Sequence, residues 1–485
     1  MRMIRGRLGK RGRALSGGGA GFLKRALTPA AVGGLFRRFR TIRPEKVARA
    51  LQADRALRHR LVNIGHLLSG NVIATLIALI GVVLTARSLG PADYGVLALI
   101  ISYARTFDRL MRFESWQPLI RYAANVDPHD PGHTGRLREL FAFGLRLDLL
   151  ACVGAALASA AIAYAFGPFL KLSADHLALV FLYCASLAFN ISGMPTAVLR
   201  LAGRFRMIAY VQVSGNVLRV LLCLFGLWRG GDLAYFVLAW TIAQIFGSLL
   251  FLGIAFGELR RQGIKGIWAV RLRGVTTRFP GIMGFAWSSS LSTTIRSSST
   301  EVDVLIVGAL SDPKSAGLYF MAKQLGKMAQ QVCAQVQAVL YPDIARLWAE
   351  RAYRAFHRAI SQVQIVLGAF GLAALAATAL FGEIALNLAV GAAYRGVLPL
   401  LLVQLVAVIL MMHAAPLRSA LLAMGEQRAV LRIVFWSTLA FHATALLLVP
   451  RIGAMGANIA QVVLGLLCAA GMERLRWRRW TGPGG

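Results

Sequence analysis

Acidic residues are scarce in this chain, which has 20 Asp and Glu against 54 Lys and Arg among 485 residues. Only 15% of the residues are charged, whereas 57% are hydrophobic. A ratio this apolar, sustained after about residue 60, excludes an ordinary soluble domain and is typical of membrane proteins. The basic residues lie between apolar runs, without the interleaved aromatics of a nucleic-acid surface, so we expect no nucleic-acid partner.

Cysteine is also scarce. The five cysteines fall inside apolar runs, and no two have the spacing of a metal or redox site. No glycine-rich phosphate loop ending in Lys-Ser or Lys-Thr occurs, which excludes nucleotide hydrolysis. His129 and His133 have His-x3-His spacing, but in a Pro/Gly-rich loop without helical context. We therefore expect no metal, no cofactor and no enzyme activity.

The N-terminus is basic, and we find in it no short apolar core that ends at a small-residue cleavage site. Residues 1–43 are rich in Arg and Gly, and 44–60 has the pattern of a basic amphipathic helix on anionic lipid. A disordered orientation signal explains the same composition. Both interpretations remain open.

Twelve stretches are apolar and long enough to cross the hydrocarbon core, which takes about 20 residues. The segments before, between and after these stretches would lie alternately on the two sides of the membrane. Those on one side hold 39 Lys and Arg, and those on the other side hold six. Positive residues favour the cytoplasm, so both termini are expected there. The expected spans are 62–86, 94–120, 140–166, 175–199, 207–228, 233–256, 281–309, 315–342, 359–381, 397–422, 430–450 and 455–473.

One block of the sequence occurs twice, 222 residues apart. Pro91 and Gly95 lie between two apolar runs, and Pro313 and Gly317 do the same in the second copy. With six spans each, both halves would enter the membrane from the same side. They would then be related by a pseudo-two-fold axis along the membrane normal. The predicted parts are a basic extension (1–60), a six-helix bundle (61–256), a cytoplasmic linker (257–280), a second six-helix bundle (281–473) and a basic tail (474–485).

Nine basic residues lie within the expected spans, at a cost of about 3 kcal/mol each at a helix centre. Most must therefore face water or a partner, or extend to the lipid headgroups. Arg105, Asp108 and Arg109 fall on one stripe of the second span, at i, i+3 and i+4. In the eighth span Lys327 is the repeat equivalent of Arg105, which indicates two facing walls of a central cavity.

Such a cavity would hold an anion, because Arg and Lys side chains match phosphate oxygens. The predicted binding residues are Arg105, Arg109, Arg296, Lys323 and Lys327. Three acids, Asp108, Glu301 and Asp303, could carry a coupling cation or proton, or could only neutralise neighbouring cations. Ser288 to Asp303 is rich in hydroxyls, which suits a helix that lines water on one side and packs closely on the other.

Four segments also resemble a known family, the bacterial polysaccharide-biosynthesis membrane proteins of the Wzx flippase type. The similarity covers roughly 62–470. The segments are Thr85 to Gly95, Asp303 with Gly308 and Ala316 to Tyr319, Tyr394 to Leu401, and Leu422 to Gly425.

The resemblance implies an all-α fold like that of the MATE transporters, in the multidrug/oligosaccharidyl-lipid/polysaccharide (MOP) superfamily. It implies a flippase that moves a polyprenyl-diphosphate-linked oligosaccharide across the bacterial inner membrane by alternating access. The product would serve exopolysaccharide, capsule or O-antigen assembly. The partners of the flippase would be membrane lipids and glycan polymerase and export proteins. The chain departs from the family in its long basic N-terminus and in having twelve expected helices where members often have fourteen.

Two alternatives remain at this stage. One is a cation-coupled multidrug exporter of the same superfamily, which a cationic lumen disfavours because typical drug substrates are cations. The other is a non-transporting scaffold for envelope assembly, which predicts that the intramembrane charges tolerate neutral substitution.

Overall fold

The structure is a computed structural model that describes residues 55–127, 129–166, 174–270 and 274–480. Met1–Gly65 and His66–Gly485 form separate units. The prediction for residues 1–54 lies outside the described residues. The contacts discussed below all belong to the second unit.

Every regular element in the described part of the chain is helical. Nine helices there are long and apolar enough to cross a membrane, judged by length and composition. The all-α membrane fold is thereby confirmed. The count of twelve spans stays a prediction, because 70–123 counts once although it holds two expected spans, and 282–310 and 313–349 are not among the nine.

The helices follow one another along the chain with few long connections. They are α4 (Arg55–Met111), α5 (Trp116–Ala123), α6 (His133–Phe166), α7 (Ala174–Ala185), η2 (Ser186–Phe189), α8 (Gly193–Leu201), α9 (Phe205–Arg229), α10 (Leu233–Arg261), η3 (Ile267–Ala269), α11 (Val275–Arg278), α12 (Ile282–Leu310), α13 (Pro313–Ala349), α14 (Tyr353–Ala389), η4 (Ala392–Tyr394), α15 (Val397–Ala423), α16 (Gln427–Ile452) and α17 (Ala454–Trp480).

Two expected spans, 94–120 and 175–199, are broken in the structure, whereas the break inside α4 falls between two expected spans. In α4, Gly90 has φ 72° and ψ 174°, so the helix breaks there into two segments, and Pro91 starts the second. The second segment ends at Met111 and the chain resumes as α5. The expected span 175–199 is likewise broken into α7, η2 and α8, with residues 190–192 non-helical.

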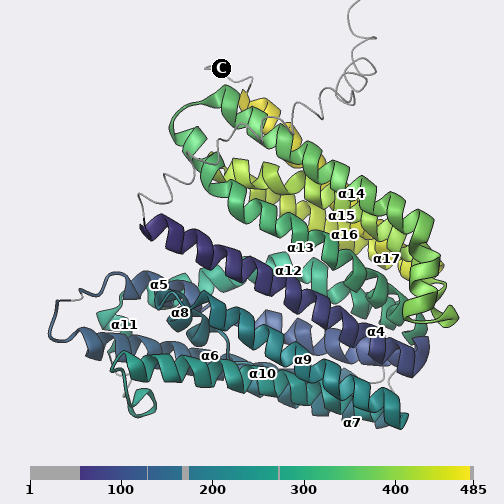
Figure 1. Cartoon of the computed structure of the whole chain (residues 1–485), viewed down its shortest axis with the longest axis horizontal. Helices are drawn as coiled ribbons and strands as arrows, with labels where there is room; N and C mark the ends of the chain where they lie inside the picture. The colour runs from purple at the N-terminus through teal and green to yellow at the C-terminus, as the bar shows by residue number, and fades with distance from the viewer. Residues whose placement is uncertain (1–54, 128, 167–173, 271–273, 481–485) are drawn as a thin grey trace, which may run out of the picture. The chain divides into compact units, whose positions relative to one another are not determined.

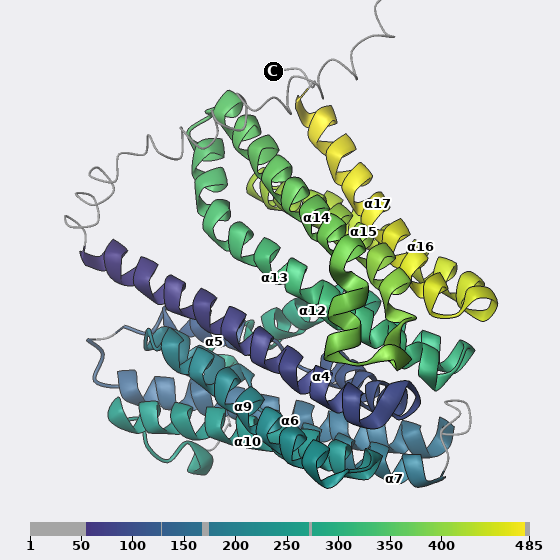
Figure 2. The same cartoon turned by 45° about the vertical axis from the view of Figure 1, so that its right-hand side comes forward.

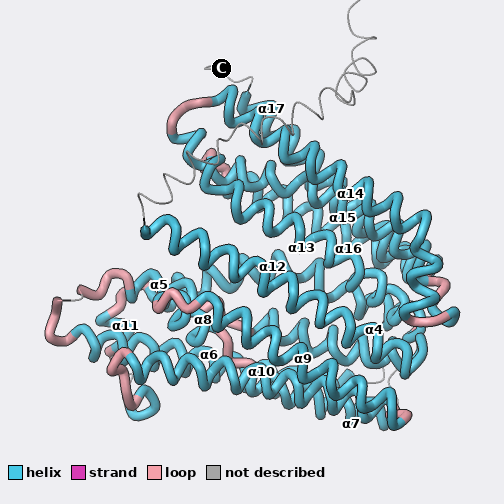
Figure 3. The backbone as a smooth tube through the Cα atoms, viewed as in Figure 1, coloured by secondary structure: helices cyan, strands magenta, loops and turns pink. Residues whose placement is uncertain are grey.

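Helices α5 to α10 pack against one another, and so do α12 to α17. Figure 1 shows α14 to α17 side by side on one side of α12 and α13, and Figure 2 shows residues 66–89 of α4 running between α13 and α9. The loops gather at two opposite ends of these helices (Figure 3). The predicted domain boundaries are not tested by this packing and stay predictions.

Large apolar side chains point outward where lipid is expected. On α14, Leu380, Ile384 and Leu388 follow one another at i, i+4 and i+8 and are 70–79% exposed. A soluble domain rarely exposes such a row, whereas in a bilayer the row faces acyl chains of the same polarity.

The two copies of the repeated block touch each other. Gly95 lies against Pro313 and Gly317, and Gly317 lies against Pro91 and Gly95. This reciprocal contact, in which each copy uses the same residues, is what a two-fold relation produces. Only glycine fits, because a Cβ at position 317 would come within 2.6 Å of the Pro91 carbonyl oxygen.

Aromatic side chains surround this crossing. The ring of Tyr94 lies 6.0 Å from that of Phe320 and 6.2 Å from that of Tyr394, between ring centroids. The Tyr394 hydroxyl donates to the backbone oxygen of Ala86 at 2.8 Å. These buried contacts join the two halves at the end of the helices that carries Pro91 and Pro313.

The hydroxyl-rich helix α12 packs along the second segment of α4 and α5. Ser290 Oγ accepts from the backbone N–H of Glu114 at 3.0 Å, and Thr294 Oγ1 donates to the backbone oxygen of Arg109 at 3.2 Å. Such small hydroxyl residues let helix backbones approach closely in a membrane.

Candidate functional site: a cationic cavity between the halves

A polar space is lined by both segments of α4 and by α7, η2, α9 and α10 from the first half of the chain. From the second half it is lined by α12, α13, α15 and α17. It consists of two adjoining cavities of about 570 and 410 Å³, which we together call the central cavity. Residues that line both are Arg105, Arg109, Glu301, Gln324 and Lys327.

The central cavity is cationic. Arg105, Arg109 and Lys327 line it, and so does Arg219 from α9. None of the four lies within ion-pair distance of a carboxylate among the described residues, although Glu301 lines the same space. Arg219 lies over the Trp240 ring, 4.5 Å from its centroid, and donates to Asn216 Oδ1. Four cations therefore face one unpaired carboxylate.

Helix geometry explains how two distant sequence positions meet here. Arg105 and Arg109 are one turn apart on α4 and share a face, and Lys327 occupies the equivalent depth of α13. The structure brings Arg105, Arg109 and Lys327 to one cavity. Their part in ligand binding stays a proposal.

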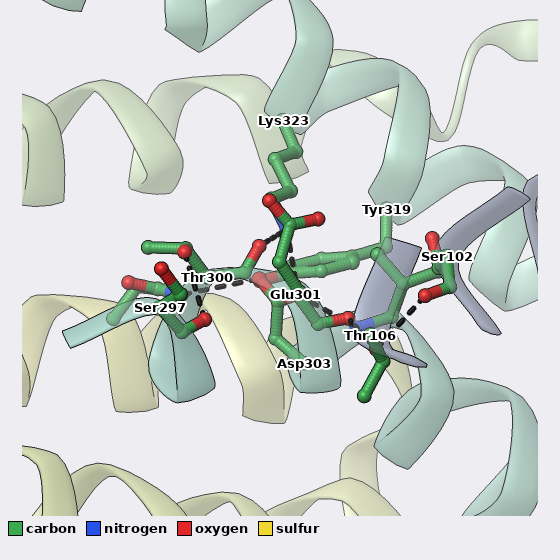
Figure 4. Close-up of polar contacts among 10 residues, drawn as sticks. Ser102, Thr106, Ser297, Thr300, Glu301, Asp303, Tyr319 and Lys323 are labelled. Carbon is green, nitrogen blue, oxygen red and sulfur yellow. Dashed lines mark hydrogen bonds and ion pairs between the residues drawn. The ribbon is translucent and has the colours of Figure 1, made fainter. Parts of the chain in front are cut away.

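Lys323 also lines the central cavity, but its charge is engaged. Its Nζ lies 2.6 Å from Asp303 Oδ1 and donates to the backbone oxygen of Thr300 (Figure 4). Asp303 is fully buried, and its other oxygen accepts from Tyr319 at 2.8 Å and from Gln461 at 3.2 Å. Lys323 is therefore first of all the partner of a buried carboxylate.

The second predicted acid has similar contacts. Both carboxylate oxygens of Asp108 accept a hydrogen bond from Arg112, at 2.7 Å for Oδ1 and 2.5 Å for Oδ2. Oδ1 also accepts one from the Asn190 side chain at 3.0 Å. These contacts fit a charge-neutralising role better than an open cation site, and no observation tests either role. The side chain of Arg296 lies outside the described residues, although its backbone belongs to α12.

The buried pair gives a stability prediction. Replacing Lys323 by Met leaves the Asp303 carboxylate buried without its cation, which costs about 3–5 kcal/mol in buried pairs. We expect a clear fall in the unfolding temperature of the purified protein in detergent. Adding Asp303→Asn to the same chain should recover much of the loss.

Lys327→Met is the matched control, since it removes the same side chain one helical turn further along α13. Lys327 has no hydrogen bond or ion pair with a described residue, so its loss should leave the unfolding temperature unchanged or higher. Equal destabilisation by both substitutions would contradict the assignment of Lys323 to the buried pair.

A third cavity, of about 750 Å³, adjoins the central cavity. The two share Thr75, Ala78, Arg109, Arg112, Asn190, Arg219, Gln244 and Gln331. We call the third cavity the amide cavity. The sequence interpretation missed it, although Gln212, Asn216 and Arg219 recur at i, i+4 and i+7 on α9 and offered a signal. Its amide side chains are Asn71, Asn190, Gln212, Asn216, Gln244 and Gln331.

The lining of these cavities is suited to binding a polar ligand. The described residues hold no group of three or more His, Cys, Asp or Glu side chains that could bind a metal. What the lining offers is unpaired positive charge beside neutral amides, the arrangement that favours an anion attached to an uncharged polar group.

Comparison with known proteins places this chain in a family. The family model described as "Polysaccharide biosynthesis protein" matches residues 61–348. Inner membrane protein YghQ of Escherichia coli is 25% identical over 295 residues, which cover 61% of this chain and 82% of that protein.

Solved structures share the fold. An inward-facing multidrug resistance MATE family transporter of the MOP superfamily has a TM-score of 0.67 at 14% identity, covering 84% of this chain and 96% of its own. The lipid II flippase MurJ in an inward closed conformation has a TM-score of 0.66 at 13% identity, covering 85% and 87%. The MATE-like fold is confirmed.

The family match covers more than half of the chain, and the similar structures are transporters and a flippase. The nine candidate spans among the described residues are those of a multi-pass membrane protein, and the Escherichia coli relative is an inner membrane protein by name. The direction of the chain's termini stays a prediction. The chain therefore belongs to the polysaccharide biosynthesis protein family, and it shares its fold with MATE transporters and with MurJ.

Proposed function

We propose that this protein is a flippase that moves a polyprenyl-diphosphate-linked oligosaccharide across the bacterial inner membrane. The single observation that carries the proposal is the central cavity, where four cations face one unpaired carboxylate. A diphosphate supplies the negative charge that such a cavity lacks, and Arg and Lys bind its oxygens through charge-assisted hydrogen bonds.

The position of the cavity supports movement by alternating access. Arg105, Arg109 and Arg219 come from the first half of the chain, and Glu301 and Lys327 come from the second. A ligand held by both halves is released to one side or the other when the halves rock about it. The polyprenyl tail stays in the acyl chains while the charged head crosses in the cavity.

Binding of the lipid head tests this proposal directly. The purified full chain in detergent should bind undecaprenyl diphosphate at least about a hundredfold more tightly than undecaprenol, measured by native mass spectrometry. The two probes share a tail, so the difference reports the diphosphate alone. Two hydrogen bonds to charged groups, at about 1.5–3 kcal/mol each, account for that factor.

A lipophilic cation of drug type, tetraphenylphosphonium, serves as the opposing probe. We expect it to bind far more weakly than undecaprenyl diphosphate, since it would add charge to a cationic space. Preference for tetraphenylphosphonium, or equal affinity for undecaprenol and its diphosphate, would contradict the proposed function.

A further inference from the structure

We propose that the amide cavity is the subsite for the uncharged sugar residues next to the diphosphate of the transported lipid. This inference rests on the proposed function. The central cavity accounts for the diphosphate of the lipid, and the inference assigns a site to its sugars.

The lining matches sugar hydroxyls in kind. Six amide side chains face the cavity, and each amide both donates and accepts hydrogen bonds, as a hydroxyl does. The one carboxylate in the lining, Glu114, accepts from the indole N–H of Trp116 at 2.6 Å. The amide side chains of this wall can therefore orient the hydroxyls of a neutral polar ligand.

Part of this hydrogen-bonding capacity is unused. The side chains of Asn71 and Gln212 form no hydrogen bond with a described residue. Asn216, between them on the same wall, donates to the backbone oxygen of Ala74 at 2.8 Å and accepts from Arg219, which fixes its orientation. Asn71 and Gln212 are therefore the side chains free to reach a ligand.

The positive charges on this wall are divided by position. Arg112 is paired with Asp108, and Arg200 lies over the Trp116 ring, 4.2 Å from its centroid. The unpaired cations Arg109 and Arg219 are those that also line the central cavity. The central cavity is itself lined by amides, such as Gln324 and Gln330. What the amide cavity adds beyond the residues that it shares is the neutral amides of Asn71, Gln212 and Asn216.

The volume of the amide cavity and its position next to the central cavity both support a sugar subsite. In the lipid, the first sugar is bonded directly to the diphosphate, so the two subsites must adjoin. The amide cavity meets the central cavity at Arg109, Arg219 and Gln331. Its volume of about 750 Å³ falls within the range of about 300–1,000 Å³ for ligand pockets.

The test compares two probes on the full chain in detergent. One is undecaprenyl diphosphate, and the other is the same lipid bearing N-acetylglucosamine or, in a second series, galactose. In the variant with Asn71→Ala and Gln212→Ala, binding of the sugar-bearing lipid should weaken by about tenfold, because two hydrogen bonds are lost. Binding of bare undecaprenyl diphosphate should change by less than twofold.

Gln427→Ala is the matched control, because it removes an exposed amide at the start of α16 and should change neither affinity. The variant with Arg105→Ala and Lys327→Ala should weaken both probes alike. Equal weakening of both lipids by the amide variant, or no weakening with either sugar, would overturn the sugar subsite and leave the proposed function standing. If the unaltered chain binds neither lipid, both proposals fall.

Discussion

Alanine at both Arg105 and Lys327 is expected to lower export of the surface glycan at least about a hundredfold in a strain that lacks the native gene. The substitutions remove two of the four unpaired cations, one from each half of the chain. Hydrogen bonds to charged groups contribute about 1.5–3 kcal/mol each, and the sum is lost from every state that holds the diphosphate. Export is measured by quantifying glycan at the cell surface.

Two controls test whether the loss of export comes from the cations inside the cavity and not from the loss of any two positive charges. Arg87→Ala and Lys314→Ala remove exposed cations from the same two helices outside the cavity, so export should stay near normal. Exchanging the pair, as Arg105→Lys with Lys327→Arg, keeps the charge and should retain part of the activity. Since neither Arg105 nor Lys327 bonds to a described residue, the protein level on an immunoblot should not fall. Normal export by the double alanine variant would refute the assignment.

Much of this architecture could be predicted from the sequence because the determining signals are local or periodic. A span is a run of apolar residues, and the 222-residue offset needs only a comparison of the chain with itself. The offset also pairs Arg105 with Lys327, which is how two residues far apart in sequence could be assigned to facing walls.

The ion pair between Lys323 and Asp303 is harder to predict from the sequence, because it depends on how two helices pack. Asp303 and Lys323 lie at similar distances on either side of the turn before Pro313, so an antiparallel helix pair brings them to one depth. The sequence interpretation placed Lys323 among the binding cations because it considered each helix alone. Which of several nearby acids a buried cation contacts depends on helix rotation, and no local pattern fixes that rotation.

The amide cavity was missed for a related reason. Its walls come from α4, α8, α9, α10 and one residue of α13, and each helix contributes only one to three polar side chains. An isolated Asn or Gln in a span has many explanations. The break at residues 190–192, which turns Asn190 and Ser192 into the cavity, interrupts an otherwise apolar stretch that reads as one continuous helix.

Alanine at Gly95 or Gly317 is expected to stop transport by keeping the two halves apart where the repeated blocks cross. A Cβ at Gly95 would overlap the carbonyl oxygen of Pro313, and one at Gly317 would lie 2.6 Å from that of Pro91. Backbone atoms cannot rotate away as a side chain can, so the crossing must open. Export should fall at least about tenfold with either substitution.

The opening can be followed with a cysteine at Gln324, which lines the central cavity. The native cysteines are buried, so a membrane-impermeant maleimide should label Gln324→Cys selectively. Applied from the side of Pro91 and Pro313, predicted to be extracytoplasmic, the reagent should label it slowly. Adding Gly95→Ala or Gly317→Ala should raise labelling severalfold.

Loss of transport here would not come from loss of fold. Alanine favours helix over glycine by about 1 kcal/mol, so the unfolding temperature should not fall sharply. Gly253→Ala and Gly368→Ala make the same change in the interiors of α10 and α14, where nothing lies within 4 Å of the new Cβ, and should export normally. If Gly95→Ala and Gly317→Ala behave like these controls, transport does not require the two repeats to close on each other. Alternating access would then need its gate elsewhere.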